Sequence, residues 1–275
     1  MRWRCRDFTF DCAHALVMGV VNVTPDSFSD GGMWVDPDAA VAHGLDLAAA
    51  GAGMVDVGGE STRPGAAAVP PDMELDRVVP VVARLAAEGV CVSVDTRRAV
   101  VAAAALEAGA SVVNDVSAGS DPSMFATVRN SDAGIVLMHM RGEPADMQRE
   151  PRYRDVVAEV EEFLVTRVEA ALVAGVDHEA VAVDPGFGFG KTVAHNLSLL
   201  AATHRLAAIG RPLVIGTSRK SLFAAVAGVG VHERVEATLA TTVWTLMAGA
   251  TIVRVHDVEE TVQAVAVVER AREFW

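Results

Sequence analysis

Cysteine, tyrosine and lysine are scarce in this chain of 275 residues. It has three cysteines and one tyrosine, and only two of its 23 basic side chains, Lys191 and Lys220, are lysines. Cys5, Cys12 and Cys91 form no CxxC pair and no metal-ligand spacing, and an odd number of cysteines is a poor disulfide framework. The sequence therefore predicts reduced, structural cysteines, and a pairing of Cys5 with Cys12 across a hairpin is the alternative left open.

The chain also lacks long apolar runs and an excess of positive charge. No uninterrupted apolar stretch approaches the roughly 18 residues that a transmembrane helix needs, and the basic start is not followed by the apolar core of a signal peptide. A formal net charge of −13 disfavours a nucleic-acid surface, which needs clustered Lys and Arg. We therefore expect a cytoplasmic protein that binds neither membranes nor nucleic acids and meets anionic ligands with a few placed cations.

What the chain does contain is a repeated alternation of β-type and helical segments. Eight short apolar runs end at polar residues, at 16–21, 54–57, 90–94, 111–113, 135–138, 180–183, 213–215 and 252–253. Ala-rich stretches with helical spacing lie between them, at 39–50, 76–87, 99–108, 156–174, 235–248 and 259–272. Apolar runs without alternation are typical of parallel strands buried on both faces.

Eight such units predict an α/β fold, a single (β/α)8 TIM barrel, rather than a flat doubly wound sheet. The length fits one barrel, for which about 250 residues is typical, and no linker divides the chain. We expect one domain of residues 1–275. Residues 1–14 precede the first unit, and we expect a short N-terminal β-hairpin there that covers the bottom of the barrel.

Polar residues follow the predicted strands, and in a barrel these strand ends converge on one mouth. Asp95, Asn114 and Asp184 follow three of the strands, and two carboxylates with an amide suit a heterocycle that presents an amino-amidine edge. For Asp95, capping of the next helix is the alternative. Arg254 and His256 stand two residues apart after the eighth strand, so both can point at one ligand, and a cationic pair suits a diphosphate.

Two loops carry further polar groups. Residues 58–65 combine glycines with the Thr62 hydroxyl and the Arg63 guanidinium, a set that suits phosphate oxygens. Residues 22–32 hold Asp26, Asp30 and an aromatic ring, and such a loop can act as a lid.

The loop at 184–192 is rich in glycine but matches neither common phosphate motif. Pro185 replaces the first glycine of a P-loop, and Lys191 replaces the third glycine of GxGxxG. Lys220 follows the seventh strand, where a compact ammonium serves a narrow pocket better than a guanidinium. For Lys191, a ligand role, closure of its own loop and exposure to solvent stay open. For His139, packing under the ligand and direct chemistry stay open.

Together these motifs resemble the dihydropteroate synthase family over nearly the whole chain. The matching segments are 18–32 (MGVVNVTPDSFSDGG), 56–65 (DVGGESTRPG), 93–96 (SVDT), 113–116 (VNDV), 138–142 (MHMRG), 184–191 (DPGFGFGK), 218–221 (SRKS) and 254–257 (RVHD). They occur in order and at barrel spacing.

The resemblance implies a transferase of folate biosynthesis and a sulfonamide target. It would join 6-hydroxymethyl-7,8-dihydropterin diphosphate to 4-aminobenzoate and release diphosphate, by a Mg²⁺-assisted, SN1-like loss of the leaving group. The resemblance also implies a homodimer.

The same resemblance implies roles for individual residues. Those implied for the pterin are Asp95, Asn114, Met138, Asp184, Phe189 and Lys220. Those for the diphosphate are Thr62, Arg63, Arg254 and His256. Those for 4-aminobenzoate are Phe28, Pro64 and Ser221, and Asn22 is the implied Mg²⁺ ligand. The residues implied for catalysis are Asp95, Asp184, Lys220, Asp30 and Arg63.

Two other functions share parts of this pattern. A pterin-dependent methyltransferase would use the same pterin pocket, but it has no use for a diphosphate site at Thr62, Arg63, Arg254 and His256. A catalytically silent pterin-binding protein would be excluded by turnover.

Overall fold

Parallel strands closed into a barrel are the centre of this computed structural model, which describes residues 1–24, 36–62 and 65–274. The eight parallel strands of these ranges are β3 (Leu16–Asn22), β4 (Met54–Gly58), β5 (Val92–Asp95), β6 (Val112–Asp115), β7 (Gly134–Met138), β8 (Val181–Asp184), β9 (Val214–Ile215) and β10 (Ile252–Val255). They pair in the order β8-β7-β6-β5-β4-β3-β10-β9, and a bridge from Val183 to Leu213 joins β8 to the segment before β9. The predicted TIM barrel is confirmed.

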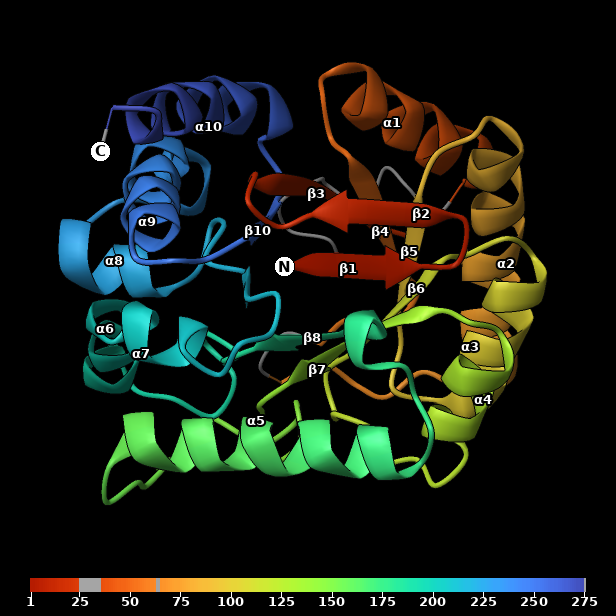
Figure 1. Cartoon of the computed structure of the whole chain (residues 1–275), viewed down its shortest axis with the longest axis horizontal. Coiled ribbons are helices and arrows are strands. Elements are labelled where there is room, and N and C mark those ends of the chain that lie inside the picture. Colours follow the sequence, from red (N-terminus) through yellow and green to blue (C-terminus); the bar gives the residue numbers. More distant parts are fainter. Residues whose placement is uncertain (25–35, 63–64, 275) are drawn as a thin grey trace.

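Helices surround the strands (Figure 1). The α-helices in the described ranges are α1 (Pro37–Ala49), α2 (Pro71–Ala87), α3 (Ala99–Glu107), α4 (Met124–Asn130), α5 (Val156–Val173), α6 (Val193–Ala201), α7 (Thr203–Ala207), α8 (Leu222–Ala227), α9 (Val235–Met247) and α10 (Val258–Arg272). One apolar core joins the outer faces of the strands to the inner faces of these helices. The sequence predicts a helix after each strand but gives no bounds for α4, α6, α7 and α8, because segments of five to nine residues are too short to show a clear helical period.

Strand register brings the polar strand ends to one level. Asn22 is aligned with Gly58, Gly58 with Asp95, and Asp95 with Asn114. On the other side of the barrel Met138 is aligned with Asp184. Residues that are far apart in sequence therefore share the carboxyl end of the barrel.

The predicted N-terminal hairpin is present as β1 (Arg2–Cys5) and β2 (Phe8–Asp11), and it lies across the opposite end of the barrel (Figure 1). Trp3 is fully buried, and its indole nitrogen donates to the carbonyl oxygen of Ala180 at 3.0 Å. Trp3 and Cys5 belong to a second apolar cluster with residues from the first positions of the strands, such as Met54 and Ile252. The hairpin therefore closes the bottom of the barrel.

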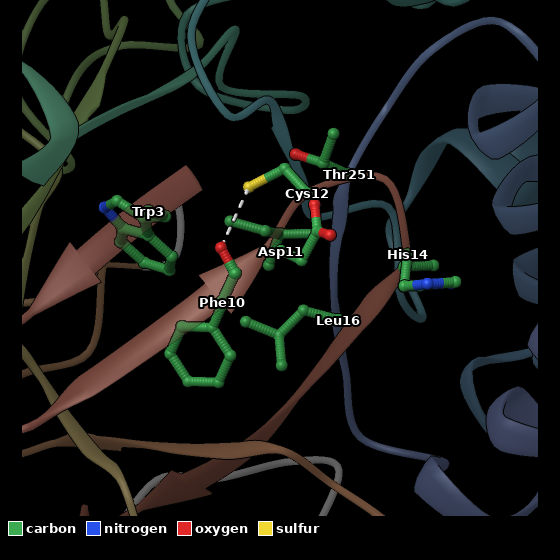
Figure 2. A pocket seen from close by; sticks show the side chains of 9 residues that line it. Trp3, Phe10, Asp11, Cys12, His14, Leu16 and Thr251 are labelled. Atoms are coloured by element: carbon green, nitrogen blue, oxygen red, sulfur yellow. Dashed lines mark hydrogen bonds between the residues drawn. The ribbon is translucent and has the colours of Figure 1, made fainter. Parts of the chain in front are cut away.

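Register also answers the question of cysteine pairing. Cys5 is opposite Phe8 at the turn, whereas Cys12 follows the other end of the hairpin, where its amide donates to the carbonyl oxygen of Met1. The two thiols do not face each other, so the pairing left open by the sequence is wrong. All three cysteines are free thiols. Cys12 lines a small cavity of about 110 Å³ between the hairpin and the strands (Figure 2).

No helix among the described residues combines the length and the apolar character that crossing a bilayer requires.

We predict that Trp3→Ala lowers the free energy of unfolding by about 3–5 kcal/mol, because it empties a buried site and leaves the carbonyl of Ala180 without its donor. Urea unfolding followed by circular dichroism measures the change. Trp3→Phe is the matched control and should cost less, since it keeps a ring in the space. An alanine variant as stable as the parent would mean that the hairpin does not contribute to the cooperative core.

Candidate functional site

A cavity of about 480 Å³ opens at the carboxyl end of the barrel strands. Eight of the residues predicted for the site line it, namely Asn22, Thr62, Asp95, Phe189, Lys220, Ser221, Arg254 and His256. Three more predicted residues, Asn114, Met138 and Asp184, are buried at the ends of β6, β7 and β8, on the same end of the barrel. Phe28, Asp30, Arg63 and Pro64 lie outside the described residues.

The floor of the cavity is built around the guanidinium of Arg254. Its Nε donates to Asp56 Oδ2 at 2.6 Å, and one of its terminal nitrogens donates to Asp95 Oδ2 at 2.9 Å. Asn114 Nδ2 donates to the same oxygen of Asp56 at 3.0 Å. Two carboxylates thus share one cation, which leaves the floor with an excess of hydrogen-bond acceptors.

Two acceptor atoms of this floor have no hydrogen-bond partner among the described residues, and one of them belongs to a residue that lines the cavity. These atoms are Asp56 Oδ1 and Asp95 Oδ1, and both are buried. Buried polar atoms without partners are rare and costly in folded proteins. A ligand that presents N–H donors would satisfy the oxygen of Asp95, which lines the cavity. The helix-capping alternative for Asp95 is not favoured, since its carboxylate faces Arg254.

Asp56 is a residue of this floor that the sequence does not single out. Its side chain is fully buried. It lies inside the run 54–57, which was interpreted as apolar. A carboxylate between Val55 and Val57 in a strand buried on both faces is the signal that could have revealed it, because such a charge needs a buried partner.

Burial raises the pKa values of two carboxyl groups at this end of the barrel, those of Asp95 and Asp184. Burial raises the pKa of Asp95 to about 7; Arg254 acts in the opposite direction, and Asp56 adds to the rise. Burial also raises the pKa of Asp184, while the amide of Gly186 and the charge of Lys220 oppose the change. The Gly186 amide donates to Asp184 Oδ1 at 2.6 Å. A cation or a set of N–H donors placed against these carboxyls would therefore favour their ionised forms.

The two lysines lie close to each other in the fold but in different surroundings. Lys220 lines the cavity, with its ammonium 4.3 Å from the centre of the Phe189 ring. Lys191 is buried and bonds to the carbonyls of its own loop, so solvent exposure, one of the alternatives for it, is wrong. His139 is buried as well and meets the edge of the Phe163 ring at a centroid distance of 4.9 Å, which favours packing over direct chemistry.

A second group of residues that line the cavity, here called the cationic wall, consists of Ser218, Arg219, Arg234 and His256. The ring Nδ1 of His256 lies 3.0 Å from Ser218 Oγ, and the backbone amide of His256 donates to the same hydroxyl at 3.1 Å. Arg219 and Arg234 also line the cavity, and neither was predicted. This wall suits an anion, whereas the floor suits N–H donors.

The chain is similar to known proteins over most of its length. A family described as "Pterin binding enzyme" matches residues 18–256. A dihydropteroate synthase of Mycobacterium leprae is 50% identical over 260 residues, which cover 92% of each chain. That of Escherichia coli (strain K12) is 45% identical over 262 residues, covering 95% of this chain and 93% of the relative.

Solved structures extend the similarity to the whole fold. The Yersinia pestis dihydropteroate synthase, described as a sulfonamide drug complex, superposes with a TM-score of 0.96 at 43% identity and covers 99% of this chain and 100% of its own. The Xanthomonas albilineans enzyme in complex with 7,8-dihydropteroate superposes with a TM-score of 0.88 at 42% identity and covers 99% of each chain.

We predict that Asp95 makes the protein less stable as the pH rises from about 4 to about 7. A carboxyl whose folded-state pKa is about 7 and whose unfolded pKa is near 4 stabilises the fold fully below pH 4, and this contribution is lost as the pH rises through 7. Over this window the parent should lose about 3 kcal/mol relative to Asp95→Asn. Urea unfolding of both proteins at each pH tests this, and parallel pH curves would contradict it.

Proposed function

Because the chain belongs to the pterin-binding enzyme family, we infer that the cavity at its barrel mouth is the active site of a dihydropteroate synthase. The enzyme joins 6-hydroxymethyl-7,8-dihydropterin diphosphate to 4-aminobenzoate and releases diphosphate and 7,8-dihydropteroate, a step of folate biosynthesis. The observation that carries this conclusion is the division of one cavity into an acceptor-rich floor and a cationic wall. A methyltransferase would have no use for that wall.

The floor recognises the pterin in this proposal. Asp95, Asp184 and Asn114 would accept and donate the hydrogen bonds of the amino-amidine edge, and Asp95 supplies an acceptor that the described protein groups leave unused. Lys220 would donate from the side, held in place over the Phe189 ring. Met138 and Phe189 form the apolar walls, and Arg254 lies beside the face of the ring.

The diphosphate binds to cations of both parts of the cavity in this proposal, Arg254 of the floor and His256 of the wall. Arg254, His256 and Thr62 line the cavity and can meet its oxygens, and Arg63 is proposed as a further cation. Arg254 is held by two carboxylates, so its orientation is fixed before the substrate arrives. Preorganised charge of this kind stabilises a leaving group without further rearrangement.

A Mg²⁺ ion fits the same wall through Asn22. Mg²⁺ prefers oxygen ligands and commonly binds through one or two protein oxygens together with substrate phosphates. The half-buried Asn22 offers one such amide oxygen at the edge of the cavity. When bound, the ion would supply positive charge to the departing diphosphate.

The reaction proceeds by departure of the diphosphate before attack. The C–O bond of the pterin methylene breaks and its electron pair leaves with the diphosphate, so positive charge develops near Asp95 and Asp184. The amine of 4-aminobenzoate then forms the new C–N bond and loses a proton. Asp30 is proposed to cover this cation, and Phe28, Pro64 and Ser221 to hold 4-aminobenzoate, with Ser221 at the cavity edge.

We also propose that residues 1–275 act as one domain and that the enzyme works in the cytoplasm as a homodimer. Helices α6, α8 and α9 are neighbours, since α6 contacts α8 and the Trp244 indole nitrogen on α9 donates to Leu200 O on α6 at 3.1 Å. Their exposed large apolar side chains are Val193, Leu197, Val226, Val243, Trp244 and Met247. Exposed apolar patches mark interaction surfaces, and we assign this one to a second copy of the chain.

The dimer predicts that Trp244→Glu raises the dissociation constant roughly a hundredfold, because a charge would replace an aromatic anchor that is 57% exposed in the single chain. Light scattering across a dilution series measures the mass. Val173→Glu, on the end of α5, is the matched control and should leave the mass unchanged. A wild-type protein that is monomeric at high concentration would contradict the dimer.

The enzymatic function predicts diphosphate release that depends on 4-aminobenzoate and yields dihydropteroate. Asp184→Asn and Lys220→Ala should each lower this rate about a hundredfold or more, because each removes a buried or half-buried charge from the site. Chelation of Mg²⁺ should also slow the reaction. The charge-matched control is Arg152→Ala, which removes an exposed cation. Pterin binding without turnover by the parent protein would overturn the synthase assignment.

A further inference from the structure

The ammonium of Lys191 lies inside the protein although it belongs to a loop. Its side chain is only 3% exposed. Nζ lies 2.9 Å from Gly186 O, 3.0 Å from Phe189 O and 2.9 Å from His139 Nδ1, and a longer contact of 3.3 Å joins it to His139 O. The loop between β8 and α6 therefore wraps around the end of this one side chain.

The carbonyls of the loop are bonded by its own backbone and by side chains together, since the amide of Phe189 donates to Gly186 O at 3.1 Å. Gly186, Gly188 and Gly190 have φ angles of 69°, 80° and 62°, so the chain reverses direction repeatedly and forms no regular ladder. Tyr153 OH donates to Gly190 O at 2.9 Å, and the Gln148 side-chain amide donates to Gly188 O. The carbonyls that face inward, those of Gly186 and Phe189, are bonded by Lys191.

Both of these inward carbonyls belong to residues that orient the pterin pocket. The amide of Gly186 donates to Asp184 Oδ1, while its carbonyl accepts from Lys191. The ring of Phe189 lies below the ammonium of Lys220, while its carbonyl accepts from Lys191. The side chain of Lys191 thus holds the backbone at both Gly186 and Phe189.

We propose that Lys191 is a positioning residue for the pterin substrate, acting through the carbonyls of Gly186 and Phe189 to hold Asp184 and the Phe189 ring in their binding positions. The proposal rests on the synthase function given above. It assigns Lys191 no contact with the substrate and no part in the chemical step.

Lysine suits this position better than arginine. An ammonium is compact and has three donors that can meet three converging acceptors, whereas a guanidinium is planar and wider. Space at the site is small, since a Cβ added at Gly186 would lie 2.0 Å from His139 O. This also explains why one of only two lysines in the chain occurs here.

The surroundings of Lys191 act on its protonation in opposite directions. Burial lowers the pKa of Lys191 to about 7; Asp184 opposes the change, and Lys220 and Arg141 add to it. Burial and the charge of Lys191 lower the pKa of His139 to about 3, so this ring stays neutral and its Nδ1 can accept. When Lys191 is protonated, its three hydrogens have short-range acceptors in Gly186 O, Phe189 O and His139 Nδ1.

The test compares the affinity of purified variants for the pterin diphosphate, measured by calorimetry without 4-aminobenzoate, with their steady-state constants. Lys191→Met keeps the length of the side chain and removes the donors, and Lys191→Arg keeps the charge. Tyr153→Phe is the matched control, because it removes one hydrogen bond from the same loop, at Gly190 O. Lys191→Ala is assayed with and without ethylammonium, which can return an ammonium to the space.

We expect Lys191→Met and Lys191→Arg to weaken pterin binding roughly tenfold or more and to raise the KM for the pterin diphosphate, with the KM for 4-aminobenzoate within about twofold. Tyr153→Phe should change pterin affinity less than threefold, and ethylammonium should restore binding to Lys191→Ala, whereas ethanol should not.

Two results would overturn the proposal. One is unchanged pterin affinity in Lys191→Met. The other is an equal loss in Tyr153→Phe, which would indicate general loosening of the loop. Should Lys191→Met fail to fold, the ethylammonium experiment on Lys191→Ala decides alone, and absence of rescue there counts against the proposal. Failure of the parent protein to bind the pterin diphosphate would instead overturn the synthase function.

Discussion

The ion pairs of Arg254 with Asp56 and Asp95 are the constraint on which the barrel mouth depends. One guanidinium from β10 holds carboxylates from β4 and β5, so it ties together strands from the two ends of the sequence. Removing one partner from a buried pair of this kind costs about 3–5 kcal/mol, because a charge is left without compensation. The same pairing leaves the floor rich in acceptors, and this excess is what a pterin edge can use.

Two cations, Arg254 and Lys191, orient different parts of the site. Arg254 fixes the acceptors of the floor, and Lys191 fixes the loop that carries Asp184 and Phe189. Of these two cations, Arg254 lines the cavity and Lys191 does not. The hydrogen bonds of Lys191 lie in a buried environment, where such bonds are stronger than they would be in water.

Sequence alone predicted the barrel, the N-terminal hairpin and eight of the residues that line the cavity. The strand ends could be predicted because apolar runs stop at polar residues such as Asp95 and Asn114. A barrel brings the carboxyl ends of its strands together, so these residues were expected to lie near one another. Asp56 was missed because it lies within a run rather than at its end. The bounds of α6, α7 and α8 could not be predicted, because the stability of such short helices comes from packing rather than from a long amphipathic pattern.

The sequence by itself determined the order of the strands, the chemical groups at their ends and the family to which the chain belongs, since these follow from local patterns and from motifs. Only the tertiary structure decided which groups pair. Asp56 and Arg254 are 198 positions apart, and Lys191 and His139 are 52 apart. No local pattern encodes such partners, because burial and closure of the barrel select them after the strands have come together.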